Sequence, residues 1–172
     1  MDDIQLEGEA SGSQQDLTWF EAEAADILGA SWKVVDDLAS SGGTHIGSAD
    51  GDGNENDAAP GPEWIATYNF NAAGGVYKVW LRSQEAGGNS FWVRIRTASS
   101  QNVEDPDQVG TGWVRFNGLQ APNGWAWDEV HNDDPSTVVV NWTLAPGAHV
   151  LEIGKREDGT LVDTILITND LD

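Results

Sequence analysis

The chain has no cysteine, and among its 172 residues only 8 are basic while 29 are acidic. The absence of cysteine excludes disulfides, and a domain of this length does not need them, because it can bury about two-thirds of its unfolded surface. It leaves the redox compartment open. No stretch is long and apolar enough to form a membrane-spanning helix. The scarcity of cations, at a net charge of -21, argues against a nucleic-acid partner, since phosphate binding depends on a cationic surface.

Sequence signatures of catalysis are also scarce. The three histidines, His45, His131 and His149, are scattered and lack the spacing of a metal site or a neighbouring nucleophile motif. No Gly-x-Ser-x-Gly motif and no phosphate-binding loop is present. A carboxylate pair for glycoside hydrolysis is defined by its separation in space, so a compact polysaccharide lyase or glycosidase stays an alternative.

The chain is expected to form one domain after a polar N-terminal segment. Residues 1–16 lack hydrophobic periodicity and predict a linker or disordered tail, and because they form no signal peptide we expect an excised module with its export signal upstream. Over residues 17–172, short runs rich in Val, Ile, Trp, Tyr and Thr alternate with Gly, Pro, Asn and Asp. We therefore predict an all-β fold, an antiparallel β-sandwich of jelly-roll type. Strands are expected near 17–24, 32–36, 44–47, 64–71, 76–84, 90–97, 112–116, 126–130, 137–144, 148–156 and 161–168, and residues 21–29 compete as a helix.

Tryptophan and basic residues recur at alternate positions in three of these runs. Successive side chains of a strand point to opposite faces, so Tyr77, Val79 and Leu81 are expected to fill a core while their neighbours point away. The same holds for Phe91, Val93 and Ile95. The outward set contains Lys78, Trp80, Arg82, Trp92, Arg94, Arg96, Trp113 and Arg115. A flexible turn at residues 85–89 predicts a hairpin between 76–84 and 90–97, with Arg82 opposite Trp92 on one shared face.

This outward set has two interpretations. Indole rings stack on the apolar C–H faces of sugar rings, and guanidinium groups donate to hydroxyls or carboxylates, which predicts a platform for a polysaccharide. Alternatively, the set is a structural ladder in which arginine stacks on tryptophan across neighbouring strands beneath a loop. Both interpretations remain open on residue type alone.

The other tryptophans are assigned by their neighbours. Trp64 follows a Pro-Gly-Pro segment and opens a strand, where it either contributes to a sugar-binding loop rim or plugs the end of the sandwich. Trp125 and Trp127 lie two residues apart, and we expect one to stack on ligand and the other to pack inside. The remaining three lie in apolar runs and are expected in the core: Trp19, Trp32 and Trp142.

Several segments together resemble carbohydrate-binding modules of families 6 and 35. The segments are Phe20-Glu21-Ala22-Glu23-Ala24, residues 73–82 (AGGVYKVWLR), residues 90–95 (SFWVRI), residues 144–153 (LAPGAHVLEI), residues 156–163 (REDGTLVD) and residues 167–170 (ITND). They match, in order, a Glu-x-Glu opening, a glycine turn before a long strand, a Gly-x-His-x-Leu strand and an acidic closing strand. The resemblance covers roughly residues 17–170. It implies a module that binds polysaccharide without cleaving it and holds a structural calcium near the N-terminal strand.

The residues themselves suggest how calcium would be held. Glu21 and Glu23 are two apart, so a strand places both carboxylates on one side, where oxygen ligands suit a hard cation. If the first and last strands pair antiparallel, we expect Asp170 rather than Asp163 to supply the third carboxylate, with backbone carbonyls completing the shell. A solvated acidic edge strand is the alternative. The acidic segment 50–57 lacks the glycine and glutamate positions of an EF-hand loop and is predicted to be an acidic loop.

The sequence therefore predicts a non-catalytic carbohydrate-binding module that targets an appended, secreted enzyme to cell-wall polysaccharide. We expect a monomer tethered to a catalytic domain, secreted or at the cell surface, with no nucleic acid and no membrane as partner. A calcium-stabilised surface adhesion module without sugar affinity is a further alternative. The arginines leave uronates, sulfated galactans and neutral sugars equally open as ligands.

Overall fold

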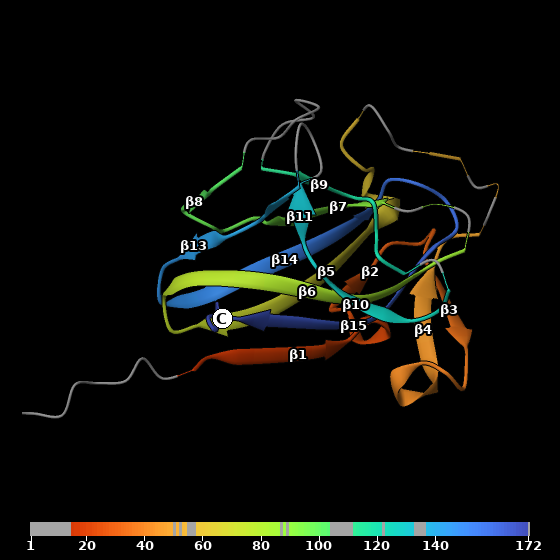
Figure 1. The fold of residues 1–172 in the computed structure, drawn as a ribbon, viewed down its shortest axis with the longest axis horizontal. Helices are drawn as coiled ribbons and strands as arrows, with labels where there is room; N and C mark the ends of the chain where they lie inside the picture. The colour runs from red at the N-terminus through yellow and green to blue at the C-terminus, as the bar shows by residue number, and fades with distance from the viewer. Residues whose placement is uncertain are drawn as a thin grey trace, which may run out of the picture.

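The computed structural model of the chain is a sandwich of two antiparallel sheets (Figure 1). It confirms the predicted all-β, antiparallel class. The structure describes residues 15–49, 51, 53–54, 58–86, 88, 90–103, 112–121, 123–132 and 137–171. Within these ranges there is no helix with the length and hydropathy needed to cross a membrane.

The strands divide between two sheets, here called sheet I and sheet II. Sheet I contains β1 (Leu17–Glu21), β3 (Lys33–Asp36), β4 (Thr44–Gly47), β6 (Gly75–Glu85), β8 (Ser100–Gln101), β10 (Ala126–Glu129), β13 (Trp142–Leu144) and β15 (Thr160–Thr168). Sheet II contains β2 (Ile27–Leu28), β5 (Ile65–Ala72), β7 (Ser90–Ile95), β9 (Val114–Asn117), β11 (His131–Asn132), β12 (Val138–Val139) and β14 (Gly147–Lys155). Short 3-10 helices occur at η1 (Ala22–Ala24), η2 (Ser41–Gly43) and η3 (Pro62–Trp64).

The core lies between the two sheets and is built from alternate residues of their strands. Tyr77, Val79 and Leu81 point inward from β6, as the alternation predicts, and all three are buried. The inward residues of β7 are buried as well: Phe91, Val93 and Ile95. The predicted inward set is therefore confirmed, because a period of two decides locally which side of a strand is apolar.

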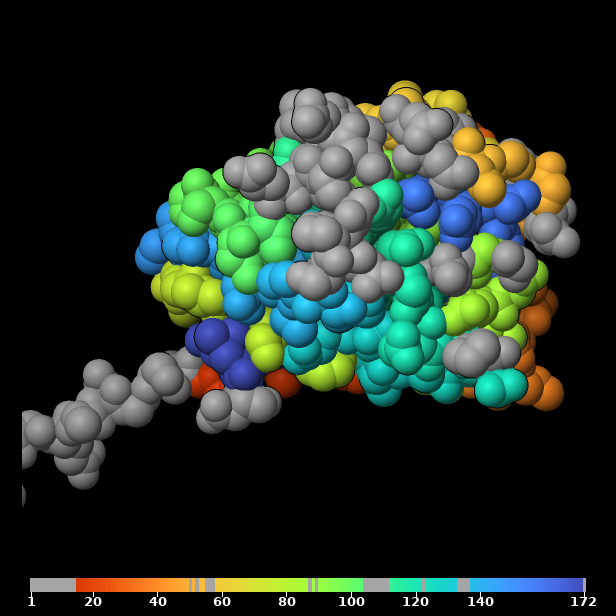
Figure 2. Space-filling view, turned by 45° about the horizontal axis from the view of Figure 1, so that its top comes forward, coloured from red at the N-terminus to blue at the C-terminus, as the bar shows by residue number. Residues whose placement is uncertain are grey.

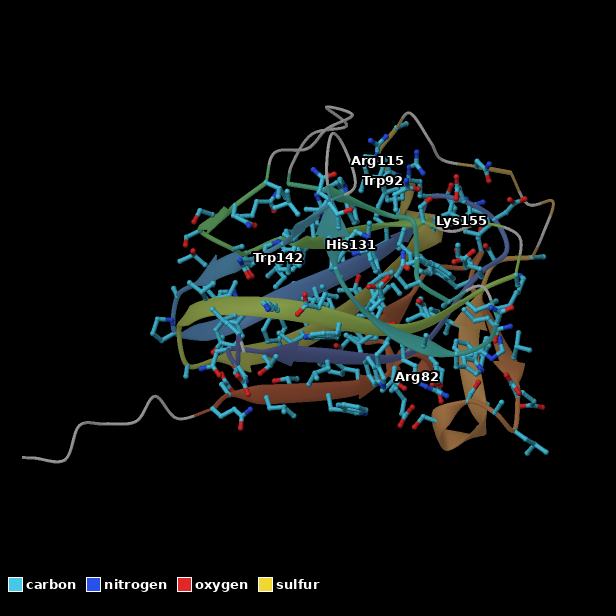
Figure 3. All side chains as sticks on the ribbon, in the orientation of Figure 1. Arg82, Trp92, Arg115, His131, Trp142 and Lys155 are labelled. Atoms are coloured by element: carbon cyan, nitrogen blue, oxygen red, sulfur yellow. The ribbon has the colours of Figure 1, made fainter. Side chains whose placement is uncertain are left out.

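Strands β6 and β7 do not pair, and the predicted hairpin between them is wrong. Strand β6 pairs with β15 and β10 in sheet I, whereas β7 pairs with β14 and β9 in sheet II. The chain crosses from one sheet to the other between these strands. Because the inward residues of both strands meet in one core, their outward residues face opposite surfaces of the sandwich. Arg82 accordingly lies on the other side of the molecule from Trp92 and Arg115 (Figure 3).

The first and last strands pair antiparallel, as expected, from Leu17 opposite Thr168 to Glu21 opposite Thr164. Strand β1 ends at Glu21, and the possible helix over 21–29 is reduced to the single turn η1. The fold begins before residue 17: Asp16 accepts hydrogen bonds from the Tyr77 hydroxyl (2.6 Å) and the Ala73 N–H (2.8 Å), so its assignment to the linker is wrong. The rest of that segment, residues 1–14, lies outside the described residues.

Candidate functional site

The outer face of sheet I is formed by four adjacent strands, in the order β1, β15, β6 and β10. Their registers align outward residues into two neighbouring rows that cross all four strands. One row contains Trp19, Leu166, Trp80 and Glu129, and the next contains Glu21, Thr164, Arg82 and Trp127. The predicted site residues Trp80, Arg82 and Trp127 are thus brought together on one surface.

The indole rings of Trp19 and Trp127 contact each other across the outer face, although two strands lie between their own strands. Their ring centroids are 5.1 Å apart with planes tilted by 58°, although β15 and β6 lie between β1 and β10. The two residues are 49% and 39% exposed, respectively, which leaves aromatic surface open to solvent. The assignment of Trp19 to the core is wrong. Alternation with Glu21, an acidic residue that does not belong in an apolar core, is the signal that places Trp19 on the outer side of the strand.

A hollow of about 340 Å³ lies beside this tryptophan pair. We call it the tryptophan hollow, and it is lined by Trp19, Ala39, Ser40, Ser41, Arg82, Trp127 and Thr164. Its volume falls within the range of roughly 300–1,000 Å³ that small-molecule sites occupy. The lining combines two aromatic walls with a guanidinium donor and with hydroxyl oxygens that can accept hydrogen bonds, a composition that suits a sugar ring.

Arg82 is fixed at the base of the tryptophan hollow by several contacts. Its guanidinium forms an ion pair with the buried carboxylate of Asp163 and donates to the backbone carbonyl of Ala39 at 3.2 Å. It also lies 5.5 Å from the ring centroid of Trp125. The guanidinium therefore has a defined orientation and a counter-charge before any ligand is present.

Trp125 itself belongs to a packed cluster behind Arg82. Its indole N–H donates to Asp37 at 3.0 Å, and its ring contacts the buried His45 edge-on at a centroid distance of 5.0 Å. The Ala39 backbone N–H and then the Trp125 indole hold the pKa of Asp37 below its usual value. Burial lowers the pKa of His45, against opposing attraction from nearby carboxylates. Trp125 is thus half-buried in this cluster, while Trp127 is exposed.

A second pocket, of about 420 Å³, opens at the edge of the same face, next to Trp80. We call it the Trp80 pocket, and it is lined by Trp80, Gly118, Gln120, Asp128, Glu129, His131, Thr137 and Val139. In the space-filling view, the segments 112–132 (green-cyan to cyan) and 137–144 (blue) lie side by side on the surface (Figure 2). Glu129 pairs with Lys78 at 3.0 Å, and burial raises the pKa of Asp128.

The outer face of sheet II has a different character. Trp92 and Trp113 are 0% and 1% exposed, and the guanidinium of Arg94 lies 4.2 Å from the ring centroid of Trp113. Arg94 also donates through Nε to the buried Glu152 at 2.5 Å. Arg115 lies opposite Trp92 in the pairing of β7 with β9. The expectation that these residues share one platform with Trp80 and Arg82 is wrong. Trp80 and Arg82 lie on β6 of sheet I, whereas Trp92 and Arg115 lie on β7 and β9 of sheet II.

Trp64 lies apart from both sets. It is half-buried, and the ammonium group of the fully buried Lys155 lies 3.3 Å from its ring centroid. The same ammonium donates to the Gly53 carbonyl at 2.7 Å, and the Trp32 indole donates to the Trp64 carbonyl at 2.8 Å. These contacts attach the segment around Gly53 to β14. Most of the acidic segment 50–57 lies outside the described residues.

The predicted metal residues are only partly brought together. Glu21 accepts a hydrogen bond from the Ser41 hydroxyl at 2.8 Å, and Glu23 accepts one from the Thr44 hydroxyl. The second carboxylate oxygen of each glutamate is buried without a hydrogen-bond partner among the described residues. Both carboxylates approach the backbone at Gly42, where φ is 63°. Two buried, unpartnered anionic oxygens beside a loop are a donor set that fits a hard cation.

The preference for Asp170 as the third metal ligand is wrong. Antiparallel pairing places the end of β15 beside the start of β1, whereas Glu21 lies at the end of β1 and so beside the start of β15. Asp163 is therefore the nearer carboxylate, while Asp170 accepts from Gln15 at 2.6 Å. Asp163 itself accepts from the Ser41 N–H at 2.9 Å and pairs with Arg82. The described residues contain no group of three acidic, histidine or cysteine side chains arranged around one ion.

No protein-family model and no curated protein matches the chain. Its fold is shared with solved carbohydrate-binding modules. A family 6 module of Cellvibrio mixtus lichenase 5A, in complex with cellotriose, has a TM-score of 0.56 and 14% identity, covering 88% of this chain and 96% of that chain. A family 35 module from Clostridium thermocellum has a TM-score of 0.52 and 17% identity, covering 88% of this chain and 97% of that chain.

A third similar structure is the Podospora anserina GH26-CBM35 β-(1,4)-mannanase. The TM-score is 0.58 at 14% identity, and the match covers 88% of this chain but 27% of the mannanase. The chain thus spans about a quarter of that enzyme's length. The fold is that of family 6 and family 35 carbohydrate-binding modules, which confirms the resemblance seen in the sequence at the level of fold.

Proposed function

We propose that the chain is a non-catalytic carbohydrate-binding module that holds a polysaccharide on the outer face of sheet I. The proposal is carried by the exposed Trp19–Trp127 pair beside the tryptophan hollow. Indole faces stack on sugar rings, and the guanidinium donor and the hydroxyl oxygens of the hollow, which can accept, suit sugar hydroxyls. The fold supports this function, because the C. mixtus module with the same fold was solved with cellotriose.

The arrangement of carboxyl groups around the two pockets supports a module that binds sugar without cleaving it. Glycoside hydrolysis uses two carboxyl groups about 5–10 Å apart, on either side of the scissile bond. None of the described residues that line the tryptophan hollow carries a carboxyl group. In the Trp80 pocket, Glu129 is paired with Lys78 and Asp128 accepts the Gln120 N–H at 3.0 Å. Both carboxyl groups of this pocket therefore already have protein partners.

The module would direct an attached enzyme to its polysaccharide. In the P. anserina mannanase, a chain about three times as long contains a region with this fold. We propose the same arrangement here: a monomeric module tethered to a catalytic domain, secreted or at the cell surface. The strong negative charge of the chain supports solubility in such a setting.

We further propose that calcium has a structural role at Glu21 and Glu23. Their unpartnered oxygens would bind the ion, and backbone carbonyls of the adjacent loop would complete its oxygen shell. The ion would supply positive charge that compensates two buried carboxylates. Ser41 contacts Glu21 and also lines the tryptophan hollow, so the loop that receives the ion is also a wall of the sugar site.

The test removes each ring of the exposed pair in turn. Trp19→Ala and Trp127→Ala are expected to weaken binding of cellotriose or β-1,4-mannotriose several-fold, because a stacked ring contributes about 1 kcal/mol. Affinity follows from isothermal titration, and stability from urea unfolding. Stability is expected to change by no more than about 1 kcal/mol, since both side chains are substantially exposed.

Ile27→Ala is the matched control, because Ile27 is an exposed apolar residue, 64% accessible, on β2 of sheet II. It should leave affinity unchanged. Equal binding by both tryptophan variants and the parent would place the sugar elsewhere. Release of reducing sugar by the parent would select the lyase or glycosidase alternative, and failure to bind any glycan would select the adhesion module.

A further inference from the structure

The cations on strands β1, β6, β10 and β15 of sheet I are already paired with acidic groups of the protein. The strands β1, β6, β10 and β15 contribute two basic residues to this sheet region, Lys78 and Arg82. Lys78 is held by Glu129 at 3.0 Å and donates to the Leu171 carbonyl at 3.0 Å. Arg82 is held by Asp163, whose side chain is fully buried. Neither cation carries an uncompensated charge.

The same four strands contribute more acidic than basic residues. The acidic residues are Glu85, Asp128, Glu129 and Asp163, together with Glu21, whose charge the proposed calcium would compensate. Two of them, Asp128 and Glu129, line the Trp80 pocket, and a net charge of -21 surrounds the site. A carboxylate or sulfate entering this face would approach a region of negative potential, where repulsion between like charges opposes binding.

The paired guanidinium nevertheless retains hydrogen-bonding capacity. Arginine has five N–H donors, and among the described residues Arg82 donates one to Asp163 and one to the Ala39 carbonyl. The Arg82–Asp163 pair has no net charge, but a remaining N–H group of Arg82 can still donate to a neutral hydroxyl. The hollow therefore provides donors for hydroxyls together with two aromatic walls.

We infer that the sheet I face selects neutral glycans and discriminates against uronate-containing and sulfated ones. This inference rests on the proposed function and specifies its ligand class. An anionic sugar would need a positive charge that the protein has not already compensated. On this face the guanidinium of Arg82 is compensated by Asp163. Recognition then depends on stacking and neutral hydrogen bonds, which salt affects little.

The experiment compares sugars that differ only in charge. Cellotriose and β-1,4-mannotriose are titrated against the chain beside the same trisaccharides with C6 oxidised to carboxylate. We expect the oxidised forms to bind about tenfold more weakly at about 0.1 M salt, and the gap to narrow at about 1 M, where the Debye length falls from about 10 Å to about 3 Å. Affinity for the neutral forms should hardly change with salt.

Glu129→Gln sharpens the test by leaving Lys78 without its carboxylate partner. This variant should narrow the gap between neutral and oxidised sugars several-fold. Glu63→Gln is the matched control, because it removes the same charge from an exposed residue of η3, outside the sheet I face, and should leave the gap unchanged. Oxidised sugars that bind as tightly as neutral ones would overturn the inference but not the proposed function. Absence of binding by every sugar would overturn both.

Discussion

The two outer faces of the sandwich place the same residue types in different surroundings. On sheet II, Trp113 is buried beneath Arg94, which in turn pairs with the buried Glu152. On sheet I, Trp19 and Trp127 contact each other and stay open to solvent beside Arg82. A tryptophan next to an arginine in a strand therefore does not define a binding surface. Whether such a tryptophan is available to a ligand depends on whether other protein groups cover its ring.

The comparison also bears on the two interpretations of the tryptophan and arginine set. Sheet II has the geometry of the structural ladder, because arginine stacks on a covered tryptophan there. The rings on sheet I are exposed, as the platform interpretation requires, and a sugar platform on this face is our proposal. The sequence suggested one surface, and the structure contains two.

The largest expected difference between the faces is in stability. Trp113→Ala removes a fully buried ring and should lower the free energy of unfolding by about 3–5 kcal/mol, whereas Trp127→Ala should cost about 1 kcal/mol or less. Urea unfolding of both variants, followed by circular dichroism, measures the difference. If Trp113→Ala unfolds no more easily than Trp127→Ala, the assignment of the two faces is reversed.

Removal of the proposed calcium should lower the free energy of unfolding by an intermediate amount, because the ion would bind at Glu21 and Glu23 beside sheet I. A ligand that binds only the folded state adds about 2.7 kcal/mol at a hundredfold excess over its Kd. Chelator should therefore lower the melting temperature, and added calcium should restore it. Because Ser41 contacts Glu21 and lines the tryptophan hollow, glycan affinity should fall as well.

Double substitution Glu21→Gln with Glu23→Gln is the control for calcium, because it removes the buried charge that the ion would compensate. This variant should no longer respond to chelator. An unchanged melting temperature of the parent in chelator, together with no metal by elemental analysis, would reject the proposed calcium site.

The smallest expected effect is a pH dependence of stability at His45 on β4. Burial lowers the pKa of His45 in the folded state, so below an unfolded pKa near the usual 6.5 the unfolded chain takes up the proton more readily. Stability should therefore be fully present above that pH and fall as the pH drops through it. Urea unfolding between about pH 7.5 and about pH 5 measures this slope. A parent slope equal to that of His45→Gln would assign the dependence to other groups.

The local part of the fold was predictable from sequence, and the pairing of strands was not. Alternation placed Val79 and Phe91 inside correctly, because it depends only on neighbouring residues. The small residues at 86–88 suit a tight hairpin and a crossing between sheets equally well. Which of the two forms depends on the partners β15 and β14, which lie more than 50 residues further along the chain.

The candidate site was predictable in part for the same reason. Trp80, Arg82 and Trp127 share a face as alternation requires once β10 pairs with β6. Trp19 was missed because its apolar neighbours outweighed its alternation with Glu21. The error over Asp170 came from the position of Glu21 at the end of β1, not from the pairing of the strands.

The antiparallel pairing of β1 with β15 also fixes how the site is presented. Leu17 lies opposite Thr168, so the two ends of the described fold emerge together, while Glu21 and the Ser41 wall of the hollow lie toward the opposite end of β1. Both ends of the described fold therefore lie away from the Ser41 wall of the hollow. They are close enough to be joined, and the chain reopened elsewhere, by circular permutation.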